Sequence, residues 1–199
     1  MALFIISGPS QAGKTTLANL LLNDKNVTRI ITATSRKPRQ GEVDKVDFYF
    51  LKEEDFKDKS KFIETALVHG NCYGTLKKEV EEKLKLKNTV ILVMDVQGVK
   101  SIKDNFKEII SKAITIFVLP DKLSILLERI KAKNDPNISE RIKSVKIEMS
   151  YLYLFDYIIS TSKNIEDSLK DIKYLINGNK TKELKESTKN FNVNYFLNN

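Results

Sequence analysis

A glycine-containing turn close to the amino terminus is the feature that most constrains this chain. Residues 8–15 read GPSQAGKT and fit the pattern G-x-x-x-x-G-K-[ST] at every defined position. The apolar run 3–6 predicts a buried strand before the turn, and residues 16–22 after it show helical spacing. In that context, the backbone N–H groups of the turn and the helix N-terminus surround a polyphosphate. The sequence therefore predicts a nucleoside triphosphate site; a turn that binds nothing is disfavoured because pattern and context agree.

Two side chains of this phosphate loop (residues 8–15) carry its predicted chemistry. We expect the Lys14 ammonium group to bridge the terminal phosphates and the Thr15 hydroxyl group to hold Mg²⁺. The loop does not identify the group that accepts a phosphate. The residues expected to contact the triphosphate are Gly8, Pro9, Ser10, Gln11, Ala12, Gly13, Lys14, Thr15 and Thr16.

Composition restricts the compartment. The chain of 199 residues is long enough for one core with small insertions. Its single cysteine, Cys72, excludes an internal disulfide and suits a reducing cytoplasm. No apolar run approaches the roughly 20 residues that span a bilayer, and the amino-terminal run is too short for a signal peptide. We therefore expect a cytoplasmic protein with no membrane partner.

Net charge restricts the ligands. The formal charge of +8 favours anionic partners. The lysines are spread along the chain, with no dense basic block beside aromatic residues, so we expect nucleotide phosphates and no nucleic acid. The sequence leaves a monomer and a homodimer equally open.

The order of the predicted elements indicates an α/β fold. Runs typical of strands buried on both faces of a parallel sheet are 88–95, 113–119 and 157–160. Helical spacing marks 96–110, 121–133, 138–151 and 165–176. Between residues 30 and 75 the pattern changes to short strands and loops, which predicts a parallel core with a small β-rich insertion. Ligands of such folds lie at the carboxyl ends of the strands, where Asp95 would meet the phosphate loop.

The segments within and after the insertion are less regular. The predicted strands there are 27–34, 46–51 and 62–68, and the predicted helices are 52–59 and 75–87, with Thr75 as N-cap of the latter. The predicted loops are the basic segment 35–42 and the turn-rich segment 69–74. Residues 177–199 are predicted to form a polar tail, compatible with disorder until something binds its apolar cluster at 195–197.

Five short segments, taken in order, resemble guanylate kinases. They are ISGPS at 6–10 with GKTT at 13–16, R-x-P-R-x-G-E-V at 36–43, FIE at 62–64, G-N-x-Y-G-T at 70–75 and DVQGV at 95–99. The resemblance implies a three-layer α/β/α core of the P-loop NTPase type (1–31 and 88–176), a GMP-binding insertion (32–87) and a helical lid near 129–141. It also implies Mg²⁺-dependent transfer of the ATP γ-phosphate to GMP or dGMP, giving ADP and GDP or dGDP.

The chemistry of guanine agrees with this resemblance. Guanine presents N1–H and an exocyclic amine as donors and O6 as an acceptor; Glu64 and Asp95 suit the donors, and the Thr75 hydroxyl group can donate to O6. AMP would leave buried groups of such a site unpaired, which gives discrimination. The resemblance places the GMP site at Thr32, Arg36, Arg39, Glu64, Tyr73, Thr75 and Asp95, and the catalytic cations at Lys14, Arg129 and Arg141.

Several positions depart from the family pattern. Phe48 stands where a tyrosine hydroxyl group usually contacts the acceptor phosphate, so we expect weaker acceptor binding unless Tyr49 compensates. Val93 replaces an acidic residue, which puts a role of that acid in metal binding in doubt. Gln11 replaces a common loop glycine, and Lys133 stands near a lid arginine whose paired geometry lysine lacks.

Two other functions stay open. One is a catalytically weak or dead guanylate-kinase-like domain that binds protein partners; the intact Gly13, Lys14 and Thr15 argue against it. The other is a kinase for a different monophosphate acceptor. Glu64 and Asp95, together with Thr75, favour guanine instead.

Overall fold

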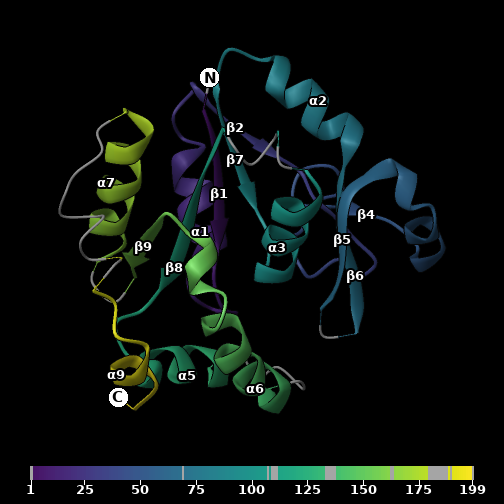
Figure 1. The fold of residues 1–199 in the computed structure, drawn as a ribbon. Coiled ribbons are helices and arrows are strands. Elements are labelled where there is room, and N and C mark those ends of the chain that lie inside the picture. Colours follow the sequence, from purple (N-terminus) through teal and green to yellow (C-terminus); the bar gives the residue numbers. More distant parts are fainter. Residues whose placement is uncertain are drawn as a thin grey trace.

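A five-stranded parallel sheet forms the centre of the molecule (Figure 1). The computed structural model describes residues 2–68, 70–106, 108, 112–132, 138–161, 164–178, 188 and 190–198. The strands lie in the order β2–β7–β1–β8–β9, and their bounds are β1 Leu3–Ser7, β2 Val27–Ile30, β7 Thr89–Val93, β8 Ala113–Leu119 and β9 Tyr157–Ser160. The parallel core predicted from the apolar runs is therefore confirmed.

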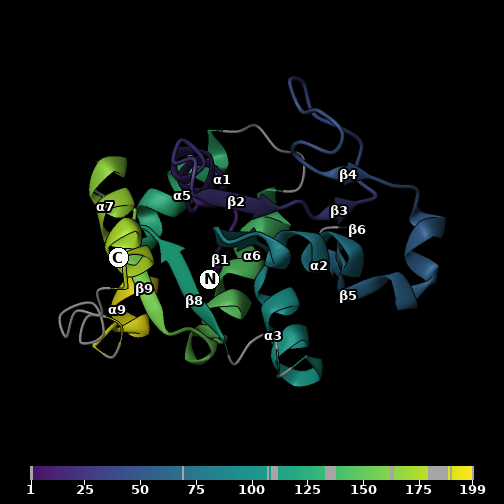
Figure 2. The same ribbon diagram turned by 90° about the horizontal axis from the view of Figure 1, so that it is seen from above.

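Helices cover both faces of this sheet. Figures 1 and 2 show α1 (Lys14–Leu21) and α7 (Ile165–Ile176) on one face and α3 (Val96–Asn105) on the other. Leu17 of α1 and Ile172 of α7 have no exposed surface. Burying such a side chain stabilises the fold by about 1.5–3 kcal/mol. The predicted three-layer α/β/α arrangement is confirmed.

A second, smaller sheet lies beside the core (Figure 2). Its order is β4–β3–β6–β5, and its strands are β3 Ala33–Thr34, β4 Tyr49–Phe50, β5 Phe62–Val68 and β6 Asn71–Leu76. Two 3₁₀-helices, Glu53–Lys57 and Lys59–Lys61, replace the short helix expected at 52–59, and α2 (Lys77–Lys85) leads back to the core. Phe56 stacks on Phe62 with ring centroids 5.1 Å apart, which gives this sheet its own small core.

Two predictions within this sheet are wrong. Residues 69–74 were expected to be a loop, yet β6 occupies 71–76 and pairs with β5 on one side and β3 on the other. Pairing on two sides outweighs a local composition that favours turns. Thr75 is not a helix N-cap, since it lies inside β6 and α2 begins two residues later.

Two other strand predictions hold only in part. The segment 46–51 pairs as a strand only over β4, with one further bridge between Asp44 and Phe48. The segment 27–34 divides into β2 of the core and β3 of the second sheet. The chain therefore passes from one sheet to the other at residues 31–32.

Two helices lie beyond the ends of β1 and β8, below the core in Figure 1. They are α5 (Leu123–Lys131) and α6 (Ile138–Met149), and a 3₁₀-helix at Leu152–Leu154 follows them. The segment 129–141 that the resemblance associates with a lid begins in the last turn of α5 and ends in the first turn of α6. Lys133 and the rest of residues 133–137 lie outside the described residues.

The end of the chain is more ordered than its composition suggests. Residues Val193–Asn198 form α9 beside α5, and Phe196 is fully buried with its ring 6.0 Å from that of Phe191 (Figure 1). The Ile158 backbone N–H of edge strand β9 donates to Thr188 Oγ1 at 2.8 Å. Part of the predicted polar tail therefore forms a helix, α9, whereas residues 179–187 lie outside the described residues. No helix in the described part of the chain has the length and apolar character needed to cross a membrane.

Candidate active site

The phosphate loop has a backbone that depends on glycine. Gly8 has φ +144°, and a Cβ atom there would lie 2.1 Å from the carbonyl oxygen of Val118 in β8. Gly13 has φ +101° and directly precedes α1. Gln11, which replaces a common loop glycine, also adopts a left-handed backbone with φ +64°. The loop therefore keeps its close contact with the sheet.

Lys14 lies across this loop. Its Nζ atom donates to the carbonyl oxygens of Gly8 at 2.6 Å and Pro9 at 2.7 Å. Burial lowers the pKa of Lys14, and the negative charges of Glu148 and Asp95 oppose that shift. The ammonium group is thus held at the loop, where it interacts electrostatically with Asp95, which lies between β7 and α3.

The start of α1 offers hydroxyl groups to solvent. Thr15 and Thr16 are both exposed in its first turn, where the helix dipole favours anions. Magnesium in nucleotide sites takes few protein oxygens and keeps water and phosphate ligands. The described residues contain no group of three or more His, Cys, Asp or Glu side chains that could hold a metal. The Thr15 hydroxyl group, exposed in the first turn of α1, is an oxygen ligand of the kind that suits Mg²⁺.

The two predicted arginines approach the loop from α5 and α6. Arg141 in α6 donates through Nη1 to Ser10 Oγ of the phosphate loop. Arg129 in α5 donates through Nη1 to Thr161 Oγ1 at 3.2 Å and through Nη2 to the Thr161 carbonyl oxygen at 2.7 Å. Thr161 Cγ2 lies 3.6 Å from the position of a Cβ atom on Gly13. Both cations therefore lie next to the loop.

Two residues of this site were not found from the sequence. Thr161 follows β9 directly, a position at the carboxyl end of a strand that could have marked it. Glu148 lies seven residues after Arg141 on α6, so the two share a helix face. Burial raises the pKa of Glu148, while the positive charges of Lys14 and Arg141 counteract this shift. Glu148 thus balances the cations around the loop.

The three residues predicted to read guanine form one cluster, here called the acceptor cluster (Glu64, Thr75 and Asp95). Thr75 Oγ1 donates to Glu64 Oε1 at 2.6 Å across the β5–β6 pair. Glu64 Oε2 lies 3.3 Å from the position of a Cβ atom on Gly98. Asp95 Oδ1 caps α3 by accepting from the backbone N–H groups of Gln97 and Gly98, at 2.7 and 3.0 Å. Both carboxylates therefore meet at the N-terminus of α3.

Glu64 has an unusual acidity. Its side chain is 7% exposed, and this burial raises its pKa from 4.5 to about 7. The hydrogen bond from Thr75 acts in the opposite direction, and the charge of Asp95 adds to the increase. The ionised carboxylate is therefore costly to hold in this site, which suits a partner that donates hydrogen bonds.

The basic loop contributes one anchored and one exposed arginine. Arg36 donates through Nη2 to Glu42 Oε1 at 2.9 Å and through Nη1 to the Lys37 carbonyl oxygen at 2.7 Å. Its Nε atom is buried and has no hydrogen-bond partner among the described residues. The side chain of Arg39 is exposed. Tyr73 lies beside Arg36, and burial, which lowers the Arg36 pKa, is outweighed by hydrogen bonds with Glu42 and Tyr73.

The neighbouring aromatic residues Phe48 and Tyr49 contact different partners. The backbone carbonyl oxygen of the half-buried residue Thr32 accepts from the Tyr49 backbone N–H at 2.9 Å. The Tyr49 hydroxyl group donates to Glu79 Oε2 at 2.9 Å, and burial together with this carboxylate raises the pKa of Tyr49 to about 12. Tyr49 is thus committed to α2, whereas the Phe48 ring faces Arg36 with 5.5 Å between Cζ and the ring centroid. Because its hydroxyl group is bonded to Glu79, Tyr49 does not replace the hydroxyl group that Phe48 lacks.

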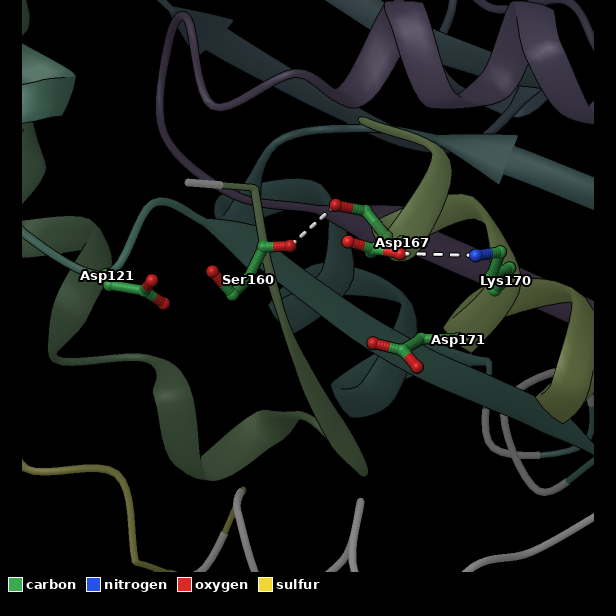
Figure 3. Close-up of a pocket in the computed structure, with 6 residues that line it drawn as sticks. Asp121, Ser160, Asp167, Lys170 and Asp171 are labelled. Atoms are coloured by element: carbon green, nitrogen blue, oxygen red, sulfur yellow. Dashed lines mark hydrogen bonds and ion pairs between the residues drawn. The ribbon is translucent and has the colours of Figure 1, made fainter. Parts of the chain in front are cut away.

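A hollow of about 470 Å³ lies elsewhere, between α7 and the ends of β8 and β9. Figure 3 shows its lining, to which Asp121, Asp167 and Asp171 contribute carboxylates and Lys170 the one cation. Lys170 Nζ is 3.3 Å from Asp167 Oδ1. The excess of negative charge disfavours a polyphosphate, so the phosphate loop remains the candidate nucleotide site.

Comparison with known proteins gives a consistent family. A sequence model described as guanylate kinase matches residues 1–179. A guanylate kinase of Fusobacterium nucleatum is 40% identical over 177 residues, covering 86% of this chain and 93% of that protein. One of Clostridium tetani is 36% identical over 184 residues, covering 89% and 86%. The crystal structure of guanylate kinase from Anaplasma phagocytophilum superposes with a TM-score of 0.71 at 26% identity, covering 92% of this chain and 88% of that one. The chain therefore belongs to the guanylate kinase family.

Proposed function

We propose that the protein transfers the γ-phosphate of ATP to GMP or dGMP in a Mg²⁺-dependent reaction, giving ADP and GDP or dGDP. Family membership supports this assignment. The observation that carries it is the acceptor cluster, in which Glu64, Thr75 and Asp95 come together from β5, β6 and the start of α3. A single cysteine suits a cytoplasmic enzyme, with ATP and GMP as its partners.

The acceptor cluster provides the groups that guanine requires. The Glu64 and Asp95 carboxylates accept from N1–H and the exocyclic amine, and the Thr75 hydroxyl group turns from Glu64 to donate to O6. Asp95 caps α3 with Oδ1, which leaves Oδ2 for the base. Adenine offers neither N1–H nor O6, so AMP would leave the buried Glu64 carboxylate unpaired.

The basic loop provides the contacts for the acceptor phosphate. Arg36 has a buried Nε–H without a protein partner among the described residues, and an unsatisfied buried donor costs about 1–3 kcal/mol. A phosphate oxygen of GMP satisfies this donor. Arg39, exposed in the same loop, and the hydroxyl groups of Tyr73 and Thr32 complete the proposed phosphate contacts.

The transfer step requires positioning and charge rather than a general base, because an anionic phosphate oxygen of GMP attacks. Lys14 leaves the carbonyl oxygens of Gly8 and Pro9 to contact the terminal phosphates of ATP. Arg129 and Arg141 stabilise the moving phosphoryl group from the lid, residues 129–141. The Thr15 hydroxyl group would hold Mg²⁺, which would supply further positive charge when bound.

A kinase assay with matched acceptors tests this function. The purified protein, ATP and Mg²⁺ are incubated with GMP, dGMP, AMP, CMP or TMP, and ADP formation is followed with and without a chelator. We expect GMP and dGMP to be phosphorylated far faster than the others, and chelation to stop the reaction. Equal rates with all acceptors would refute guanine recognition. Absence of turnover with every acceptor would favour the protein-binding alternative.

A further inference from the structure

The guanidinium group of Arg36 rests on two aromatic rings, here called the aromatic seat (Phe48 and Phe50). Its Cζ atom lies 5.5 Å from the Phe48 ring centroid and 6.0 Å from that of Phe50. The two rings are 5.9 Å apart, and the Tyr73 ring meets Phe48 edge-on at 6.3 Å. A guanidinium group within about 6 Å of a ring is attracted by the electron density of the ring face. The seat therefore holds one side of the cation.

The polar edge of Arg36 is held separately. Nη2 donates to Glu42 Oε1, Nη1 donates to the Lys37 carbonyl oxygen, and the side chain is only 14% exposed. Hydrogen bonds thus fix the direction of the two Nη atoms of Arg36, and the aromatic rings support the guanidinium group. The Nε–H is buried and has no hydrogen-bond partner among the described residues.

The segment that carries Phe48 is anchored to the core on both sides. Before it, Arg29 of β2 donates through Nη2 to the Val46 carbonyl oxygen at 2.5 Å. After it, Tyr49 is bonded to Glu79 through its hydroxyl group and to Thr32 through its backbone N–H. Glu79 also accepts from the Ile31 backbone N–H at 3.1 Å, where the chain leaves the core. The Phe48 ring therefore has little freedom to move away from Arg36.

We infer that Phe48 is a positioning residue for acceptor binding: its ring presets Arg36 for the phosphate of a nucleoside monophosphate. The inference rests on the proposed function and deepens it. Phe48 lacks a hydroxyl group to contact the phosphate itself, so its contribution passes through the cation. Without the ring, Arg36 samples more rotamers, and binding must pay the cost of ordering that side chain.

Stepwise fluorination tests whether the electron density of the Phe48 ring contributes to GMP binding. Phenylalanine with one, two or three ring fluorines is incorporated at position 48, and the Kd for GMP is measured by calorimetry without ATP. Fluorine withdraws density from the ring face with little change in size, so we expect log Kd to rise steadily with fluorine number. We expect Phe48→Leu to raise Kd about threefold to tenfold with kcat nearly unchanged, and Phe48→Tyr, which retains the ring, to bind GMP at least as tightly as the wild type.

A matched series at Phe56 provides the control. Phe56 stacks on Phe62 in the core of the same sheet, and the same fluorinations there should leave the Kd for GMP unchanged. A Kd that does not respond to fluorine number at position 48 in a protein that binds GMP would overturn the role of Phe48 and leave the proposed function intact. A wild-type protein that does not bind GMP would overturn both.

Discussion

Thr75 Oγ1 and Glu64 Oε1 are 2.6 Å apart and belong to paired residues of β5 and β6. The bond joins a buried hydroxyl group to a buried carboxyl group whose pKa is raised to about 7. The second sheet therefore keeps Glu64 in place although its charge is poorly solvated. Burying an ionisable group at such a cost in stability is typical of residues that serve binding or catalysis.

Glu64→Gln should stabilise the protein at alkaline pH. The native pKa of Glu64 is raised by burial from 4.5 to about 7, so the folded state binds more protons than the unfolded state between these pH values. The free energy of unfolding contributed by this residue therefore falls as pH rises through that interval. Denaturant unfolding at pH 8 should show the variant more stable by up to about 3 kcal/mol, a difference that closes below pH 4.5.

The exposed residue Glu54 supplies the comparison for that experiment. Glu54→Gln should leave the pH dependence of stability as in the wild type. If Glu64→Gln also leaves it unchanged, the carboxyl group of Glu64 titrates at its ordinary pKa and the proposed cost does not exist.

Lys14→Ala should abolish turnover while the protein stays folded. The Nζ atom contacts only loop carbonyl oxygens among the hydrogen bonds of the described residues, so its removal costs little stability. Loss of a charge that stabilises the transition state lowers kcat by about 100-fold or more. Steady-state kinetics and a melting curve measure both effects. Lys78→Ala, at a side chain 88% exposed, is the control, and wild-type activity of Lys14→Ala would discredit the role of the loop.

Thr161→Val should lower kcat while leaving the KM for GMP unchanged. The substitution removes the hydroxyl acceptor of Arg129 Nη1 but keeps the carbonyl oxygen that accepts from Nη2. A hydrogen bond to a charged group contributes about 1.5–3 kcal/mol, and partial loss of it predicts a kcat about fivefold lower. Thr161→Ser retains the acceptor and should behave as the wild type. A valine variant with unchanged kcat would mean that Arg129 needs only the carbonyl contact.

Phe196→Ala should destabilise the whole protein. The ring has no exposed surface and belongs to the main core, so its loss should lower the free energy of unfolding by about 3–5 kcal/mol. Asn194→Ala, at an exposed position of the same helix, should have no measurable effect. Equal stability of the two variants in denaturant unfolding would show that α9 is not docked in solution.

Much of the core could be predicted because buried parallel strands have a strong sequence signal. The runs 113–119 and 157–160 and the helix 165–176 were predicted at their observed bounds. The phosphate loop was recognisable because its backbone requires glycine at fixed positions. Glu64, Thr75 and Asp95 required the resemblance, since each residue alone is unremarkable in sequence, although the structure brings them together.

The rest depended on contacts between distant segments. Composition at 69–74 suggests a turn, but pairing with β3 and β5 makes most of it a strand. The tail reads as polar because one buried ring, Phe196, is too weak a signal against its neighbours. The bond between Tyr49 and Glu79 joins residues 30 positions apart, which no local pattern reveals. Tertiary contacts, rather than propensity, decided each of these cases.

The contact between Gly8 and the Val118 carbonyl oxygen gives the two loop glycines different tolerances. At position 8, even a methyl group collides with the backbone of β8, so alanine would push the whole loop off the sheet. At position 13, the nearest atom lies 3.6 Å away, and only the left-handed torsion opposes a side chain. When every residue is tried at each position, we therefore expect no active variant at position 8 and a weakly active asparagine variant at position 13. The first glycine allows the loop to contact the sheet, whereas the second only allows a left-handed backbone torsion.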